Sequence, residues 1–226
     1  MRSGKKGKTV RIAPPEAPET DGYAAALDLR GKFVHEDVRV RDVDLTEASA
    51  KDVQLERVVL ERVVLARANL RGLSVQDGRF DGCDMAGTAW DRAHLTRVEL
   101  DGCRLVGASF DRATFTDARF TGANAEMALF INAGFTAARF DRCNLRGASF
   151  DGADLRGVIF RDCDLRTADL RNCKLEGADL RGSQIDGAML EITRLRGVIL
   201  DPGQAMDVVA LLGVTVASRE DAEADR

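Results

Sequence analysis

The sequence has little of what most active sites and all membrane-spanning helices require. Its 226 residues include two histidines, one tyrosine, one tryptophan and four prolines. No run approaches the ~18 consecutive apolar residues of a spanning helix, and the basic N-terminus has no apolar signal core. Neither histidine has a serine or cysteine nucleophile at a recognisable spacing. We therefore expect neither an enzyme nor a membrane protein, and no catalytic residues or cofactor.

Cysteine is also scarce, and its number is odd. Five cysteines argue against a closed disulfide framework. Cys83, Cys103, Cys143 and Cys163 are spaced in multiples of 20 residues. Thiols stacked in a line inside a narrow core cannot surround an ion tetrahedrally, so we expect no metal site. Free buried thiols suit a reducing compartment, which predicts a cytoplasmic protein.

What the sequence does contain is a repeat of five residues. Every fifth residue from Leu45 to Leu200, here called a centre position, is apolar in all 32 cases, and 26 of these are Leu or Phe. A small residue almost always lies two positions before the centre. Residues two apart point to the same face of a strand, and the glycine that often follows the centre suits a turn with positive φ. We expect a coiling chain with two inward side chains per side.

The number of sides follows from a longer spacing. The cysteines and the acidic residues Glu61, Asp81, Asp101 and Asp141 share a grid of 20 residues. Four sides of five residues therefore make one coil, and residues 38–200 hold about eight coils.

Three units carry a family resemblance: Ala-Asp-Leu-Arg-Gly (153–157), Ala-Asp-Leu-Arg-Asn (168–172) and Ala-Asp-Leu-Arg-Gly (178–182). They resemble the A(D/N)LXX consensus of the pentapeptide-repeat family. The resemblance implies an all-β solenoid, a right-handed quadrilateral β-helix. With the spacing above, we expect about eight 20-residue coils, and the residues after Leu200 predict a short C-terminal helix. The handedness and the square section come mainly from the resemblance.

The ends divide the chain into further regions. We expect a disordered basic tail (1–20), an N-terminal cap (21–37), the β-helix (38–200), a C-terminal helix and strand (201–217) and a disordered acidic tail (218–226). Asp201 is a plausible helix N-cap, Pro202 a first helical residue and Gly213 a helix stop.

The C-terminal helix and strand have two interpretations. They are a lid over the last coil or, as the resemblance to gyrase-protecting family members implies, a dimer interface. The residues that would serve either role are Met206, Val209, Leu211 and Leu212.

Two outward surfaces are candidate binding sites. One is acidic: Glu61, Asp81, Asp101 and Asp141 form a column, and an adjacent side carries Asp91 and Asp111, whereas the last coils are rich in arginine. The other is apolar and comprises Met127, Leu129 and Ile131 around the small centre residue Ala125. The alternatives are an ordinary solvated face for the first and local repacking for the second.

These features predict a non-enzymatic scaffold that binds another macromolecule, a protein, through its solenoid faces. The alternative, from the resemblance to quinolone-resistance members, is a DNA-mimicking inhibitor or protector of DNA gyrase, a type II topoisomerase. Residues 21–200 carry a net charge of only −3, well below the charge density of duplex DNA. We expect no direct nucleic-acid binding by the rod, no membrane partner, and a homodimer only if the C-terminal module is an interface.

Overall fold

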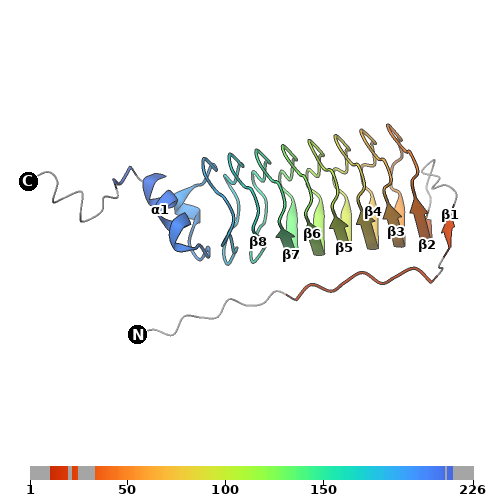
Figure 1. Ribbon diagram of the computed structural model, residues 1–226, viewed down its shortest axis with the longest axis horizontal. Helices are drawn as coiled ribbons and strands as arrows, with labels where there is room; N and C mark the ends of the chain where they lie inside the picture. Colours follow the sequence, from red (N-terminus) through yellow and green to blue (C-terminus); the bar gives the residue numbers. More distant parts are fainter. Residues whose placement is uncertain (1–10, 20–21, 25–33, 212, 216–226) are drawn as a thin grey trace, which may run out of the picture.

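The chain folds into an elongated parallel β-solenoid (Figure 1). This computed structural model describes residues 11–19, 22–24, 34–211 and 213–215. One parallel sheet holds eight strands in sequence order. The elements are β1 (Tyr23–Ala24), β2 (Val34–Arg41), β3 (Gln54–Glu61), β4 (Ser74–Asp81), β5 (His94–Asp101), β6 (Thr114–Thr121), β7 (Gly134–Asp141), β8 (Ile159–Arg161), a 3₁₀ turn η1 (Ile192–Arg194) and the helix α1 (Pro202–Leu211).

The strand register confirms a repeat of 20 residues with four sides. From β2 onward, paired strand residues lie 20 positions apart, as in Val75↔Leu95 and Phe80↔Leu100, whereas β1 pairs with β2 16 positions later (Tyr23↔Arg39). Isolated bridges such as Asp84↔Arg104 and Ala89↔Ser109 repeat the spacing on the two remaining sides. The second strand, β2, already follows the 20-residue register from Val34, so the solenoid includes residues assigned above to the N-terminal cap.

The solenoid has about six regular turns in the described part of the chain, rather than the eight predicted. Eight-residue strands run from β2 to β7, whereas β8 has three residues. After β7, the Val158 N–H donates to the Leu155 carbonyl (3.1 Å) and closes a tight turn at Gly157, where φ is +71°. This turn interrupts the strand. The chain keeps its register beyond it as isolated bridges, as far as Asp179↔Ile199.

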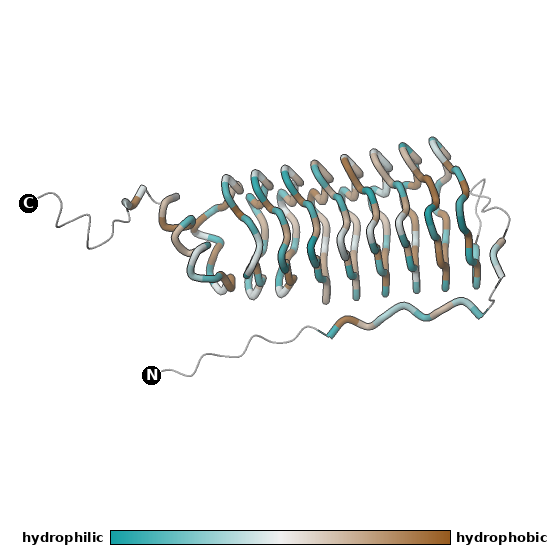
Figure 2. The backbone as a smooth tube through the Cα atoms, in the orientation of Figure 1, coloured by the Kyte–Doolittle hydropathy of each residue, from teal (hydrophilic) through white to brown (hydrophobic). Residues whose placement is uncertain are grey.

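The interior is filled by the centre positions and the small residues two before them. Every centre residue from Ala50 to Ile185 is buried. The phenylalanines form columns in which rings stack from turn to turn, with centroids 4.4 Å apart for Phe120 and Phe140 and 5.0 Å for Phe140 and Phe160. Hydrophilic and hydrophobic residues alternate along the coils (Figure 2). The core therefore leaves the outward side chains to carry function.

The corners differ from expectation in one respect. The residue two after the centre adopts positive φ at many corners where it is not glycine, for example 49° at Arg57, 58° at Arg92 and 53° at Asp117. An L residue resists this conformation by about 1–2 kcal/mol. Hydrogen bonds between turns impose it, since corner amides such as Arg92 N–H donate to the next turn (Asp111 carbonyl, 2.8 Å).

The C-terminal end confirms the predicted helix start and corrects the strand. Asp201 caps α1 and Pro202 is its first residue. Gly213, with φ of +71°, lies just beyond its last described turn. Val214 and Thr215 form no strand, and Val216 lies outside the described residues. None of the described helices is long and apolar enough to cross a membrane.

Candidate binding surfaces of the solenoid

The structure stacks the first three residues of the predicted acidic column at the ends of successive strands. Glu61 pairs in register with Asp81, and Asp81 with Asp101. Glu61 accepts hydrogen bonds from the Tyr23 hydroxyl (2.8 Å) and Arg41, which hold the pKa of its carboxyl below the usual range. Asp81 and Asp101 are exposed and form no ion pair with any described residue. The column thus presents two free carboxylates, not a continuous acidic strip.

The fourth member of the column is not available at the surface. Asp141 is buried and forms an ion pair with Arg139 (Nε to Oδ2, 2.5 Å). Thr121 stands between Asp101 and Asp141 in the column, so the acidic run is also interrupted.

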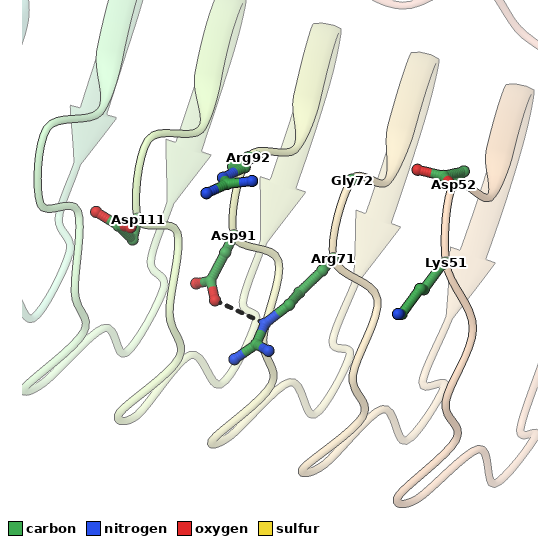
Figure 3. A pocket seen from close by; sticks show the side chains of 7 residues that line it. All are labelled: Lys51, Asp52, Arg71, Gly72, Asp91, Arg92 and Asp111. Atoms are coloured by element: carbon green, nitrogen blue, oxygen red, sulfur yellow. Dashed lines mark hydrogen bonds and ion pairs between the residues drawn. The ribbon is translucent and has the colours of Figure 1, made fainter.

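Asp91 and Asp111 line a shallow groove of about 410 Å³, which contains bases as well as acids (Figure 3). Arg71 reaches toward Asp91 (Nε to Oδ2, 2.9 Å), and Lys51 also lines the groove. These aspartates lie ten residues, half of a 20-residue turn, from Asp81 and Asp101. They therefore occupy the opposite side of the rod, not the adjacent side predicted, and cannot extend the acidic column.

The surface charges pair in two different ways along the rod. In the early turns the partners lie 20 residues apart, as in Asp42–Arg62 (2.7 Å). In the late turns they lie two residues apart within one repeat, as in Asp164–Arg166 (2.6 Å), where Asp164 also accepts the Arg166 backbone N–H (3.0 Å). Arg166 holds the pKa of Asp164 below its usual range. The same arrangement occurs in Asp154–Arg156, Asp169–Arg171 and Asp179–Arg181.

This pairing within repeats changes the expected charge distribution. The arginine-rich late coils carry their own carboxylates beside the guanidinium groups, so the rod is less basic there than the arginine count indicates. Exposed pairs of this kind add little stability, about 0–1 kcal/mol each. Their main effect is to leave few unpaired charges for a charged partner.

The apolar patch predicted at mid-rod is present. Met127 is 64% exposed and Leu129 is 38% exposed, whereas Ile131 is half-buried at the next corner. Ala125 is buried, whereas Met127 is mostly exposed, which argues against the alternative that Met127 fills the space beside Ala125. Met127 has φ of +57°, and the equivalent residues one turn away on each side are Gly107 and Gly147.

The predicted C-terminal residues divide between packing and exposure. Val208, on the same helix, packs against the core, and Val209 is half-buried. Met206 is 47% exposed. Leu211 ends the described helix, without a described side chain, and Leu212 lies outside the described residues.

All five cysteines are free and buried. Their thiols donate to backbone carbonyls, as Cys103 does to Phe80 (3.4 Å). Burial raises the pKa of Cys173 to about 12. In the described part of the chain, no cluster of three or more His, Cys, Asp or Glu could hold a metal ion.

One feature was missed by the sequence reasoning. Residues 11–19, here called the strap, were expected to be part of a disordered tail, but they run in an extended path along the solenoid (Figure 1). Three strap amides bond to aspartate side chains at one corner: Ala13 N–H to Asp117 (3.2 Å), Glu16 N–H to Asp77 (3.0 Å) and Glu19 N–H to Asp37 (3.2 Å). Residues 1–10 lie outside the described chain.

The corner beneath the strap carries alternating charges, here called the corner ladder: Asp37, Arg57, Asp77, Arg97 and Asp117. Arg57 bonds to Asp37 (2.7 and 2.9 Å), and Arg97 bonds to Asp77 (2.5 and 2.6 Å). Asp77 is only 2% exposed. Burial opposes its ionisation, but the bonds from Arg97 and the Glu16 amide outweigh that effect and hold its pKa below the usual range.

Taken together, the fold is a repeat solenoid with a filled core, and its candidate sites are surfaces formed by outward and corner side chains. Sequence models of this kind of repeat match most of the rod. The model for pentapeptide repeats matches residues 51–87 and 93–130, and the model for a pentapeptide repeat region matches residues 123–200. The chain belongs to the pentapeptide-repeat family. No curated protein sequence matches it.

Solved structures give weaker likenesses. HetL, a pentapeptide repeat protein involved in heterocyst differentiation regulation from the cyanobacterium Nostoc sp. strain PCC 7120, is 22% identical with a TM-score of 0.43, over 77% of this chain and 92% of HetL. Trypsin-treated QnrB1, a plasmid-mediated fluoroquinolone resistance protein, is 20% identical with a TM-score of 0.39, over 83% of this chain and 99% of QnrB1.

Proposed function

We propose that this chain is a non-enzymatic scaffold that binds a partner protein through its solenoid surface. The observation that supports this function is the exposed pair Met127 and Leu129 in the middle of a rod whose core is already filled. A protein partner that covers this pair would remove apolar surface from water, which drives association.

The exposure of Met127 supports a binding role over a packing role. A methionine at positive φ costs about 1–2 kcal/mol relative to an unstrained position. Because the side chain is 64% exposed, folding regains little of that cost by burial. Gly107 and Gly147, at the equivalent corners, leave room around the thioether, which adapts readily to a partner surface.

Affinity capture with matched variants tests this proposal. The full-length chain, Met127→Gly and Leu129→Ser are each immobilised, and the bound proteins are compared. Val34→Ser is the control, because Val34 is an apolar residue 57% exposed outside the patch. We expect a partner retained by the wild type and Val34→Ser and lost by both patch variants. Equal retention by all four chains would contradict the assignment of the site.

A second candidate function is the inhibition or protection of a type II topoisomerase by DNA mimicry. It is supported by the two free carboxylates of Asp81 and Asp101, stacked on neighbouring strands. A gyrase supercoiling assay, with and without a fluoroquinolone, tests it. Inhibition or drug protection that is lost in Asp81→Lys/Asp101→Lys, but kept when the exposed Asp186 is changed to Lys, would support mimicry. No effect of the wild type would remove this candidate.

Dimerisation through the C-terminal end is also proposed. Met189, Ile192 and Met206 are exposed in the last turn and in α1. We expect light scattering to show a dimer that Met206→Asp dissociates and Met127→Gly does not. The five free thiols further support a cytoplasmic location, where such thiols stay reduced.

A further inference from the structure

The strap contacts the corner ladder with a period of three residues. Its hydrogen-bonding amides belong to Ala13, Glu16 and Glu19. The residue before each of these faces the rod, since Ile12 and Pro15 are half-buried and Pro18 is buried. A polyproline II segment has three residues per turn, and its prolines restrict φ to that conformation.

The length of three strap residues matches the spacing of the aspartates in the corner ladder. Three residues of polyproline II span about 9.3 Å. The aspartates that accept the bonds are separated by 40 residues, two turns of the solenoid, which at a strand spacing of about 4.8 Å is about 9.6 Å. Successive tripeptides therefore meet successive aspartates without accumulating an offset.

The contact depends on the backbone N–H groups of the strap and leaves most of its side chains in solvent. Glu16, Ala17 and Glu19 are exposed. What the ladder requires is an N–H at every third position, directly after a residue that packs on the rod. A proline at such a position would remove the donor, whereas a proline elsewhere preserves the extended conformation.

The strap also leaves space that a different segment would use better. A hollow of about 150 Å³ lies beside it, and its lining consists of Pro15, Glu16 and Ala17 of the strap and of Arg39, Val59, Glu61, Arg79 and Asp81 of β2–β4. The Ala17 methyl group does not fill it. A larger flexible side chain at that place would gain contacts with Val59 and the Arg79 stem.

We propose that the corner ladder is a docking groove for an extended, proline-containing segment of a partner protein, and that the strap is its intramolecular occupant. The partner segment has the same pattern as the strap: every third residue packs on the rod, and the residue after it donates a backbone N–H to the ladder. At the position of Ala17 it has a larger side chain. A second copy of the chain is a poorer occupant. The strap of a second copy has the same sequence as the chain's own strap. It would have to displace that strap, which is tethered to the groove and therefore present at a high effective concentration. This groove lies half a turn from the Met127 patch and does not depend on it.

The test uses a full-length host whose own strap cannot donate: Ala13→Pro, Glu16→Pro and Glu19→Pro. These changes remove the three N–H groups and keep polyproline II geometry. Arg11→Pro is the matched control, because it adds a proline at an exposed strap position whose amide does not bond to the ladder. Fluorescence anisotropy then follows the binding of a labelled synthetic peptide with the native sequence of residues 9–20 to the host, the control and the wild type.

We expect the native peptide to bind the host more than about tenfold more tightly than it binds the wild type or the control, whose grooves are occupied. A peptide with the three prolines should bind the host at least about tenfold more weakly, and an Ala17→Met peptide at least about threefold more tightly, than the native one.

Two results would overturn the proposal. One is native-peptide binding that is undetectable at about 1 mM host, or equal for the native and three-proline peptides. The other is a wild-type dimer by light scattering that the three prolines dissociate, because a second copy would then be the occupant. The Met127→Gly variant must leave peptide binding unchanged, which separates this test from that of the proposed function.

Discussion

Asp201 and Gln204 close the end of the solenoid with reciprocal hydrogen bonds. The Gln204 N–H donates to Asp201 Oδ1 (3.0 Å), and the Asp201 N–H donates to Gln204 Oε1 (2.9 Å). The same glutamine donates from Nε2 to the carbonyls of Leu180 (2.6 Å) and Ser183 (2.7 Å) in the turn below. One buried side chain thus caps both the helix and the last turns.

Gln204→Ala should destabilise the C-terminal turns. It leaves the Ser183 carbonyl without its donor, leaves the Leu180 carbonyl with only the Ser183 N–H (3.1 Å), and breaks the capping pair, which together cost about 2–4 kcal/mol. Hydrogen exchange should show lost protection over residues 165–200 and little change over residues 60–100, because each turn contacts only its neighbours. Asp207→Ala, an exposed change on the same helix, should leave exchange unaltered. Uniform loss across the rod would contradict a local cap.

Phe120→Ala should lower the free energy of unfolding by about 3–5 kcal/mol through the cavity it creates. Phe120 is fully buried and stacks on Phe140. Urea denaturation followed by circular dichroism measures the loss. Arg119→Ala, an exposed residue on the same strand, should change stability by less than about 0.5 kcal/mol. A loss below about 1 kcal/mol for Phe120→Ala would mean that the core repacks around the gap.

Met127→Gly should leave the free energy of unfolding unchanged or raise it by up to about 1 kcal/mol. Glycine relieves the strain at φ of +57°, and its greater freedom in the unfolded chain offsets part of the gain. Leu129→Gly is the contrasting variant. Leu129 forms a β-bridge with Ser149, so glycine at this position should lower the free energy of unfolding. A marked loss of stability in Met127→Gly would mean that Met127 packs within the fold.

Acid should weaken the strap contact through Asp77. Its folded pKa is lowered by Arg97 and the Glu16 amide, which together outweigh burial. The ionised carboxylate therefore stabilises the folded chain above the unfolded pKa of about 3.9, and this contribution disappears as pH falls through the lowered folded pKa. Urea unfolding of Asp77→Asn should show a shallower loss below about pH 4 than the wild type.

The thiols should be unreactive in the folded chain. All five are buried, and desolvation raises the pKa of Cys173 to about 12, which suppresses its thiolate at neutral pH. Ellman's reagent should label none at pH 8 within minutes and all five in denaturant. Rapid labelling without denaturant would indicate that a turn opens easily.

The sequence predicts the core and the four-sided coil because one interaction determines both. Each centre residue, such as Phe120, must face inward with the small residue two before it, and this requirement repeats without a break. The turn at Asp201 and Pro202 was also predictable, since capping depends on neighbouring residues. The turn count was not, because the interruption after β7 depends on the hydrogen bond that Val158 donates to Leu155.

The strap contact could not be predicted because the strap and the corner ladder lie far apart in sequence. The alternation from Asp37 to Asp117 at intervals of 20 residues was visible, as were Ile12, Pro15 and Pro18 at intervals of three. Nothing local connects them, since Ala13 meets Asp117 across 104 residues. The position of Asp91 relative to Asp81 followed from the 20-residue turn, because half a turn places residues on opposite sides.

Because Asp and Arg alternate along the corner ladder, an even and an odd number of added turns would have different effects on the strap contact. Repeat proteins lengthen by duplicating whole coils, and a 20-residue duplication preserves every core contact. If the 20-residue duplication were inserted between Asp77 and Asp117, an arginine side chain would lie at a position where a strap amide now donates to a carboxylate. A 40-residue duplication would restore the match. As long as the strap remains docked, rods of this design can grow there only by an even number of turns.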